Sequence, residues 1–180
     1  MKILDYYSTK DLLYISIFAA LGLAIKPIIS PLINSLASWI PGGAIAGGIY
    51  MIWLVLTMAV VDKTGAGILF GITQGLLVLI LGWFGNHGII SLATYTLPAL
   101  VPEIIRLLYK NKDQIFYHIV LCSTANLAGT LLVTILIMRL PLIPLLISLV
   151  FSIISGAVGG IISYRIYNLL LSYRLVSPKN

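Results

Sequence analysis

A lysine and a threonine beside closely spaced glycines, in the stretch DKTGAGILFGITQG at residues 62–75, are residue types that could bind a phosphate group. A phosphate-binding loop needs the spacing GxxxxGK followed by Ser or Thr, so that its backbone N–H groups surround the phosphates. Here Asp62 stands directly before the lysine, where that motif has glycine. Gly67, Gly71 and Gly75 instead recur every four residues, which is typical of a helix face that packs closely on another helix. The sequence therefore predicts no ATP site in this stretch.

Other patterns of catalytic residues are also absent from the sequence. It has no HExxH, no GxSxG and no aspartate cluster for metal-dependent phosphate chemistry. Cys122 is the single cysteine, which excludes a CxxC pair, and it is expected to be a packing residue. The histidines, His87 and His118, lie far apart in the chain. We therefore expect a protein that is not an enzyme and that holds no cofactor and no metal ion.

Polar and aromatic side chains in apolar surroundings are the candidates for binding a ligand. A carboxamide in hydrocarbon needs hydrogen-bond partners outside its own helix, which singles out Gln74 and Asn126. Aromatic rings could stack on a flat heterocycle, although single rings at a membrane surface are more often anchors. The candidate ligand-binding residues are Trp39, Tyr50, Gln74, Trp83, Asn86, His87, Tyr95, Glu103 and Asn126.

Glu103 lies in an otherwise apolar stretch, and two interpretations of it stay open. It could be a structural carboxylate at the membrane interface, paired with Arg106 or His118. It could also be a ligand or gating carboxylate, because Pro98 and Pro102 can kink the predicted helix around it and open backbone groups nearby.

The elements that must position these residues follow from composition. The chain is 60% hydrophobic and only 9% charged, with a mean hydropathy of +1.09, whereas soluble domains are about 25% charged. Its uncharged runs are long enough for several spans of about 20 residues each. We predict an all-α integral membrane bundle, a single domain over residues 1–180 with six transmembrane helices. Each is bounded by turn residues or charges, and the expected ranges are 11–28, 42–61, 65–83, 88–108, 116–138 and 142–171.

The orientation follows from positive charge, which is enriched in cytoplasmic loops. With both termini cytoplasmic, only Lys26 and Arg139 lie outside, and the other lysines and arginines lie inside. The net charge of +6 is then explained by topology and anionic lipid rather than by nucleic acid. No small-residue cleavage pattern follows the first apolar segment, so we expect that segment to be retained.

The chain resembles the substrate-binding S components of energy-coupling factor (ECF) vitamin transporters. The resemblance in architecture covers essentially the whole chain, with six short helices, cytoplasmic termini and a long outer connection from Pro27 to Pro41. Ala20 and Ala24 form an AxxxA pattern in the first helix. Within residues 62–103, the segments DKTGAGILFGITQG and GWFGNHGIISLATYTLPALVPE look like the thiamine or hydroxymethylpyrimidine branch.

This resemblance implies capture of an extracellular vitamin without catalysis in this chain. The pocket would lie between the outer parts of the fourth, fifth and sixth helices, covered by the connection that contains Trp39. Ala20 and Ala24 would dock on a transmembrane coupling protein that carries two ABC ATPases, in a prokaryotic plasma membrane. One acidic candidate and several rings favour a cationic aromatic ligand such as thiamine, and a neutral pyrimidine or another vitamin remains open.

Two other classes of function also remain open. A stand-alone small-solute carrier or channel could use polar side chains of the last two predicted helices without any ATPase, and inverted repeats would favour it. No convincing repeat relates residues 11–83 to residues 88–171. The third class is a structural membrane subunit, in which the same polar side chains would be contact faces.

Overall fold

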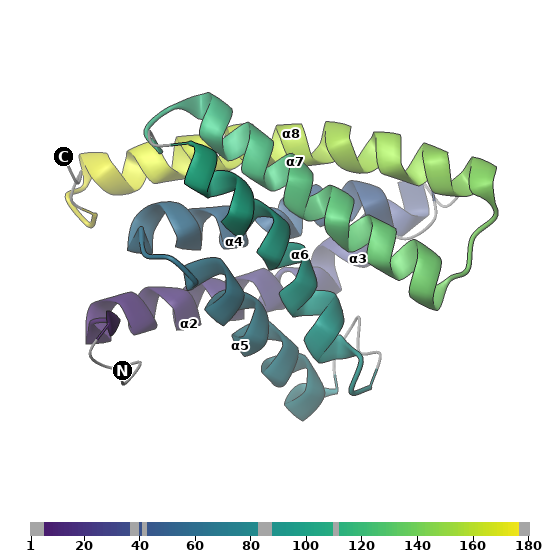
Figure 1. Cartoon of the computed structure of the whole chain (residues 1–180), viewed down its shortest axis with the longest axis horizontal. Coiled ribbons are helices and arrows are strands. Elements are labelled where there is room, and N and C mark those ends of the chain that lie inside the picture. Colours follow the sequence, from purple (N-terminus) through teal and green to yellow (C-terminus); the bar gives the residue numbers. More distant parts are fainter. Residues whose placement is uncertain (1–5, 37–39, 41–42, 83–87, 110–111, 177–180) are drawn as a thin grey trace.

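The computed structural model describes residues 6–36, 40, 43–82, 88–109 and 112–176, and every secondary-structure element within them is a helix (Figure 1). The elements are α2 (Thr9–Ala24), α3 (Lys26–Leu36), α4 (Ala44–Val61), α5 (Ala66–Leu81), α6 (Ser91–Ile105), the 3₁₀ helix η2 (Arg106–Leu108), α7 (Ile115–Leu132), the π-helix η3 (Val133–Ile137) and α8 (Leu142–Ser172).

The lengths and compositions of these helices fit a membrane bundle. Five helical segments are long and apolar enough to cross a bilayer, namely Thr9–Ile33, Ala44–Val61, Gly88–Leu108, Ile115–Ile137 and Leu142–Ser172. Helix α5 is equally apolar but shorter, with 16 residues. Many large apolar side chains of the outer helix faces are exposed, as lipid contact requires. The predicted fold class, an all-α bundle of apolar membrane helices, is confirmed.

The segment expected to be an outer connection differs from the prediction, because much of it is helical. Ile25 ends α2 in a right-handed helical conformation, and its carbonyl accepts hydrogen bonds from the backbone N–H groups of Ile28 and Ile29. Pro27 falls in the first turn of α3, where a helix needs no N–H donor. The sequence prediction treated Pro27 and Pro31 as breaks, yet the chain turns from α2 directly into a second helix.

Helix α4 is the centre of the bundle and packs against α2, α5, α7 and α8. Glycine makes the closest approaches possible, since a Cβ at Gly48 would collide with the backbone of α8 at Ser155. The glycine repeat of α5 packs as expected, with Gly71 against the α6 backbone at Tyr95. Close helix contact through small residues is the usual source of stability where water gives no driving force between helices.

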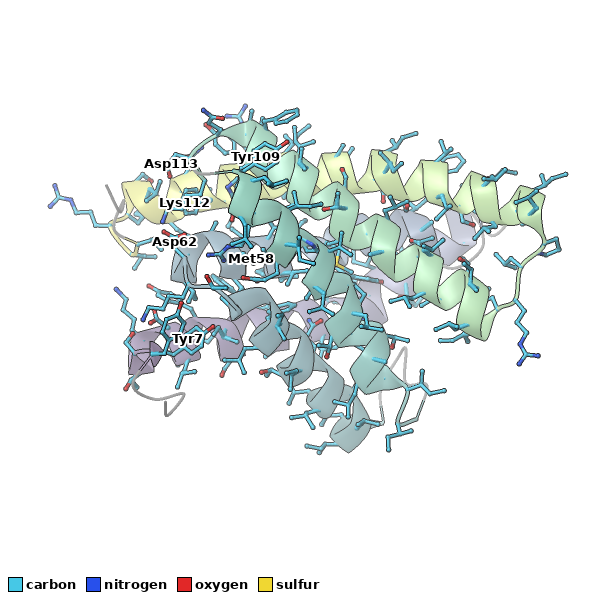
Figure 2. The ribbon with its side chains drawn as sticks, in the orientation of Figure 1. Tyr7, Met58, Asp62, Tyr109, Lys112 and Asp113 are labelled. Carbon is cyan, nitrogen blue, oxygen red and sulfur yellow. The ribbon has the colours of Figure 1, made fainter. Side chains whose placement is uncertain are left out.

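The acidic side chains that the structure describes gather at the end of the bundle where α2 begins and α8 ends. Asp62 forms an ion pair with Lys112 at 2.9 Å, and Figure 2 shows both beside Asp113. Asp11 pairs with Lys63 at 2.7 Å. These contacts join the start of α2 to the α4–α5 turn and that turn to the start of α7.

Tyr7 adds a hydrogen bond at the same end, outside the membrane spans. Burial raises the pKa of Tyr7 to about 12, so its hydroxyl stays protonated at neutral pH. The hydroxyl donates to the backbone carbonyl of Thr64 at 2.7 Å. The N-terminal segment is therefore held against the α4–α5 turn.

Gly156→Ala tests the glycine packing. The new Cβ would lie 2.5 Å from the Cα of Ser123 in α7, which forces the backbone to move, and overpacking of this kind costs about 1–3 kcal/mol. Gly129→Ala is the control, because its Cβ would lie 3.4 Å from Pro98, an ordinary contact. We expect thermal unfolding in detergent to show a lower melting temperature for the first variant only. Equal melting temperatures would contradict the packing described.

Candidate functional site

A cavity of about 200 Å³ lies between α4, α5, α6 and α7, with Lys26 of α3 at its edge. Aromatic and aliphatic side chains form much of its wall, including Phe70, Met51 and Leu54. Its polar side chains come from five elements and are Lys26, Tyr50, Gln74, Thr94, Tyr95, Asn126 and Thr130. The cavity therefore combines ring faces with a small number of hydrogen-bonding groups, which is the usual composition of a small-molecule site.

The cavity is displaced from the expected pocket between the last three predicted helices. Helix α8 contributes no lining residue, and α4 and α5 contribute several. The middle of α8 packs closely on its neighbours. A Cβ at Gly160 would lie 2.5 Å from the Cα of Ile119 in α7, and Gly159 approaches the backbone of α4 at Gly48.

Asn126 and Gln74 are buried in the cavity wall, and both carboxamides bond to other helices, as predicted for such groups in hydrocarbon. The amide nitrogen of Asn126 lies 2.9 Å from the carbonyl oxygen of Ala44 in α4 and 2.8 Å from that of Ser152 in α8. The amide nitrogen of Gln74 donates to the carbonyl of Ala19 in α2 at 3.1 Å. These contacts hold the cavity wall in place.

Tyr50, Tyr95 and Lys26 form a cluster at the edge of the cavity. The ammonium of Lys26 donates to the hydroxyl of Tyr95 at 2.6 Å. It also lies 4.0 Å from the ring centroid of Tyr95 and 5.1 Å from that of Tyr50, within the range of cation–π contact. The Tyr50 hydroxyl is 2.6 Å from that of Ser30 in α3.

Lys26 is a cavity residue that the sequence prediction treated only as an outer-side cation. A signal was available, because Lys26 is the only charged residue between Asp11 and Asp62. A lysine inside so long an apolar run is costly and calls for a specific role. The prediction placed Lys26 near the end of the first helix, before the proline-rich connection, and counted it only toward the charge on the outer side.

Glu103 does not line the cavity. Its carboxylate accepts hydrogen bonds from the backbone N–H of Gly65 at 2.7 Å and of Gly67 at 3.0 Å, at the start of α5. It also pairs with Arg106 at 3.5 Å, as the structural interpretation expects. His118 is not part of this pair, since its ring nitrogens lie near Ser163 and the carbonyl of Lys112. An acidic group at a helix N-terminus is stabilised by the unsatisfied N–H groups there.

Four predicted ligand-binding residues lie outside the residues that the structure describes, and their roles stay predictions. They are Trp39, Trp83, Asn86 and His87. Of the five that are described, the structure brings four together around the cavity, Tyr50, Gln74, Tyr95 and Asn126. Glu103 is the one that lies elsewhere.

The fold recurs in a known protein, although no protein family model and no curated protein matches this sequence. A solved structure described as the crystal structure of an S-component of ECF transporter superposes with a TM-score of 0.73. The alignment covers 94% of this chain and 88% of that chain, at 18% sequence identity. This chain has the fold of an ECF transporter S component.

Within this S-component fold, the predicted docking residues form an exposed stripe on α2. Ser16, Ala20 and Ala24 are all exposed and recur every four residues, while Leu13 and Leu21 nearby are exposed as well. The other side of α2 carries Gly22, which faces Trp53 and Gln74 inside the bundle. The stripe is therefore not used for packing within the described part of the chain.

Glu103→Gln separates the two interpretations of this carboxylate. Glutamine keeps one acceptor oxygen, so one of the two glycine N–H groups loses its partner, and hydrogen bonds to charged groups are worth about 1.5–3 kcal/mol. We expect a lower melting temperature in detergent and unchanged retention of any small molecule that co-purifies with the unaltered protein. Asp11→Asn is the control, because its partly exposed pair with Lys63 is worth about 0–1 kcal/mol. Loss of the small molecule at an unchanged melting temperature would instead assign Glu103 to ligand binding.

Proposed function

We propose that this chain is the membrane-embedded, substrate-binding S component of an ECF-type ABC importer, and that it captures an extracellular vitamin or vitamin precursor. The observation that carries the proposal is a cavity lined by aromatic and hydrogen-bonding side chains within an S-component fold. The chain binds and delivers its solute, and hydrolysis of ATP takes place on partner subunits. No side-chain cluster suited to a metal ion occurs among the described residues.

The lining supports a small, flat heterocycle as the solute. Tyr50, Tyr95 and Phe70 supply ring faces, and Gln74 and Asn126 supply carboxamides. The volume of about 200 Å³ is below the roughly 300–1,000 Å³ of pockets for drug-sized ligands, which favours a single ring. Among thiamine-like solutes we therefore favour a pyrimidine precursor over thiamine itself, whose cation would lie near the Lys26 ammonium with no carboxylate among the described lining residues.

The charge distribution supports an outward-facing cavity. Lys63, Arg106 and Lys112 lie at the end of the bundle where α2 begins and α7 starts, and the positive-inside rule assigns such an end to the cytoplasm. The cavity then opens toward the outer side of a prokaryotic plasma membrane. The coupling protein and its two ABC ATPases would dock through the exposed stripe of Ser16, Ala20 and Ala24 on α2.

Purification in mild detergent from the native membranes, followed by native mass spectrometry, tests the function. We expect a retained vitamin-like small molecule together with co-purifying ATPase subunits. A retained molecule of another chemical class with ATPases would keep the importer and change the solute. Absence of both, with solute movement into vesicles in the absence of ATP, would indicate a stand-alone carrier. Absence of all three would indicate a structural subunit.

Simultaneous Ala20→Leu and Ala24→Leu substitution tests the docking stripe. Two leucines on a smooth face prevent the close helix approach that small residues allow, so we expect loss of the co-purifying ATPases and unchanged retention of the small molecule. Ala93→Leu, an exposed alanine of α6, is the matched control and should leave the ATPases bound. An unaltered complex after the double substitution would rule out this stripe as the docking face.

A further inference from the structure

The acidic residues that the structure describes lie away from the cavity. The chain has five acidic residues, at positions 5, 11, 62, 103 and 113, and the last four are described. Asp11 pairs with Lys63, Asp62 with Lys112, and Glu103 with Arg106 and the start of α5. Asp113 accepts a hydrogen bond from the hydroxyl of Tyr167. No described carboxylate lines the cavity.

Lys26 is the one charged side chain among the described residues that line this cavity. The ion pairs in the described part of the chain do not include it. Its protein contacts are the Tyr95 hydroxyl at 2.6 Å and the rings of Tyr95 and Tyr50. Such contacts hold an ammonium group in place and offset part of its desolvation, but they do not neutralise its charge.

The direction of the Lys26 side chain argues against simple anchoring at the membrane surface. A lysine near a helix end that only anchors extends its ammonium away from the bundle toward the headgroups. Lys26 extends from α3 to Tyr95 of α6 instead, across the edge of the cavity. The ammonium is therefore positioned where a solute in the cavity would meet it.

We propose that Lys26 is the anion-binding residue of the cavity and that the captured solute carries a carboxylate or a phosphate group. This inference rests on the proposed function and narrows its substrate class to acidic, single-ring heterocycles. A solute anion supplies the opposite charge that the described cavity wall lacks, and a charge-assisted hydrogen bond from the ammonium is stronger than one between neutral groups. The tyrosine rings and the two carboxamides then contact the rest of the solute.

Matched probes that differ in one acidic group test the inference on the purified full-length protein. Nicotinate and nicotinamide form the carboxylate pair, and hydroxymethylpyrimidine monophosphate and hydroxymethylpyrimidine form the phosphate pair. We expect at least one acidic member to bind about tenfold more tightly than its neutral partner, as one charge-assisted contact allows. The pair that shows the preference distinguishes the carboxylate from the phosphate. Binding is measured by isothermal titration calorimetry in detergent.

Three variants separate the charge of Lys26 from its packing. Lys26→Met should abolish the preference for the acidic probe, Lys26→Arg should preserve it, and Arg139→Gln should leave it unchanged. Arg139 is an exposed cation outside the cavity lining, so it controls for the loss of one positive charge. The melting temperature of ligand-free Lys26→Met should not fall, because replacing a partly buried charge by an apolar side chain of similar length is often neutral or stabilising.

The results of these measurements distinguish a failure of the anion-binding inference from a failure of the proposed function. Tighter binding of both neutral members, or equal binding within both pairs, would overturn the anion assignment and leave the importer intact. An acidic preference that survives Lys26→Met would overturn the role of Lys26. If no probe binds, the chemical class of the molecule that is retained on purification tests the inference instead. A retained molecule with an acidic group, lost from Lys26→Met, supports the inference, and one without such a group overturns it. No binding and no retained molecule would contradict both proposals.

Discussion

The carboxamide of Asn126 and the glycines around it hold the cavity in shape. In hydrocarbon a buried amide must find partners within the protein, and Asn126 finds them on α4 and α8, which ties both helices to α7. Its side-chain oxygen lies where a Cβ of Gly47 would be, so this position of α4 must be glycine for the amide to fit. The cavity lies among α4, α5, α6 and α7, and α8 contributes no residue to its lining.

The charged side chains at one end of the bundle and the charged side chain at the cavity have different kinds of partner. At one end, the described carboxylates are matched by lysine, arginine, tyrosine or backbone N–H groups, so the turns there are fixed by internal pairs. At the cavity, Lys26 has aromatic and hydroxyl neighbours but no described carboxylate partner. At that end the described carboxylates are therefore matched within the protein, and the cavity leaves a positive charge for a solute to meet.

The two alanines of α2 and the glycines elsewhere illustrate two uses of small residues. Gly48, Gly156 and Gly160 lie at helix contacts where any side chain would collide with a neighbouring backbone. Ala20 and Ala24 have the same four-residue spacing, yet they face outward. Spacing alone predicts only that a face is smooth. Whether that face packs internally or is available to another protein depends on which side of the helix the bundle covers.

The sequence by itself determined the membrane class, the apolar helices and the need of Gln74 and Asn126 for partners on other helices, because hydropathy and the cost of unpaired polar groups act locally. It also singled out Tyr50 and Tyr95. It did not reveal that α3 is a helix, since Pro27 and Pro31 resemble a break until Ile25 is seen to continue the turn. Only the tertiary structure decided the place of Lys26 and of Glu103. Both are charges in apolar stretches of sequence, and their different surroundings depend on which helices pack beside them, which no local pattern encodes.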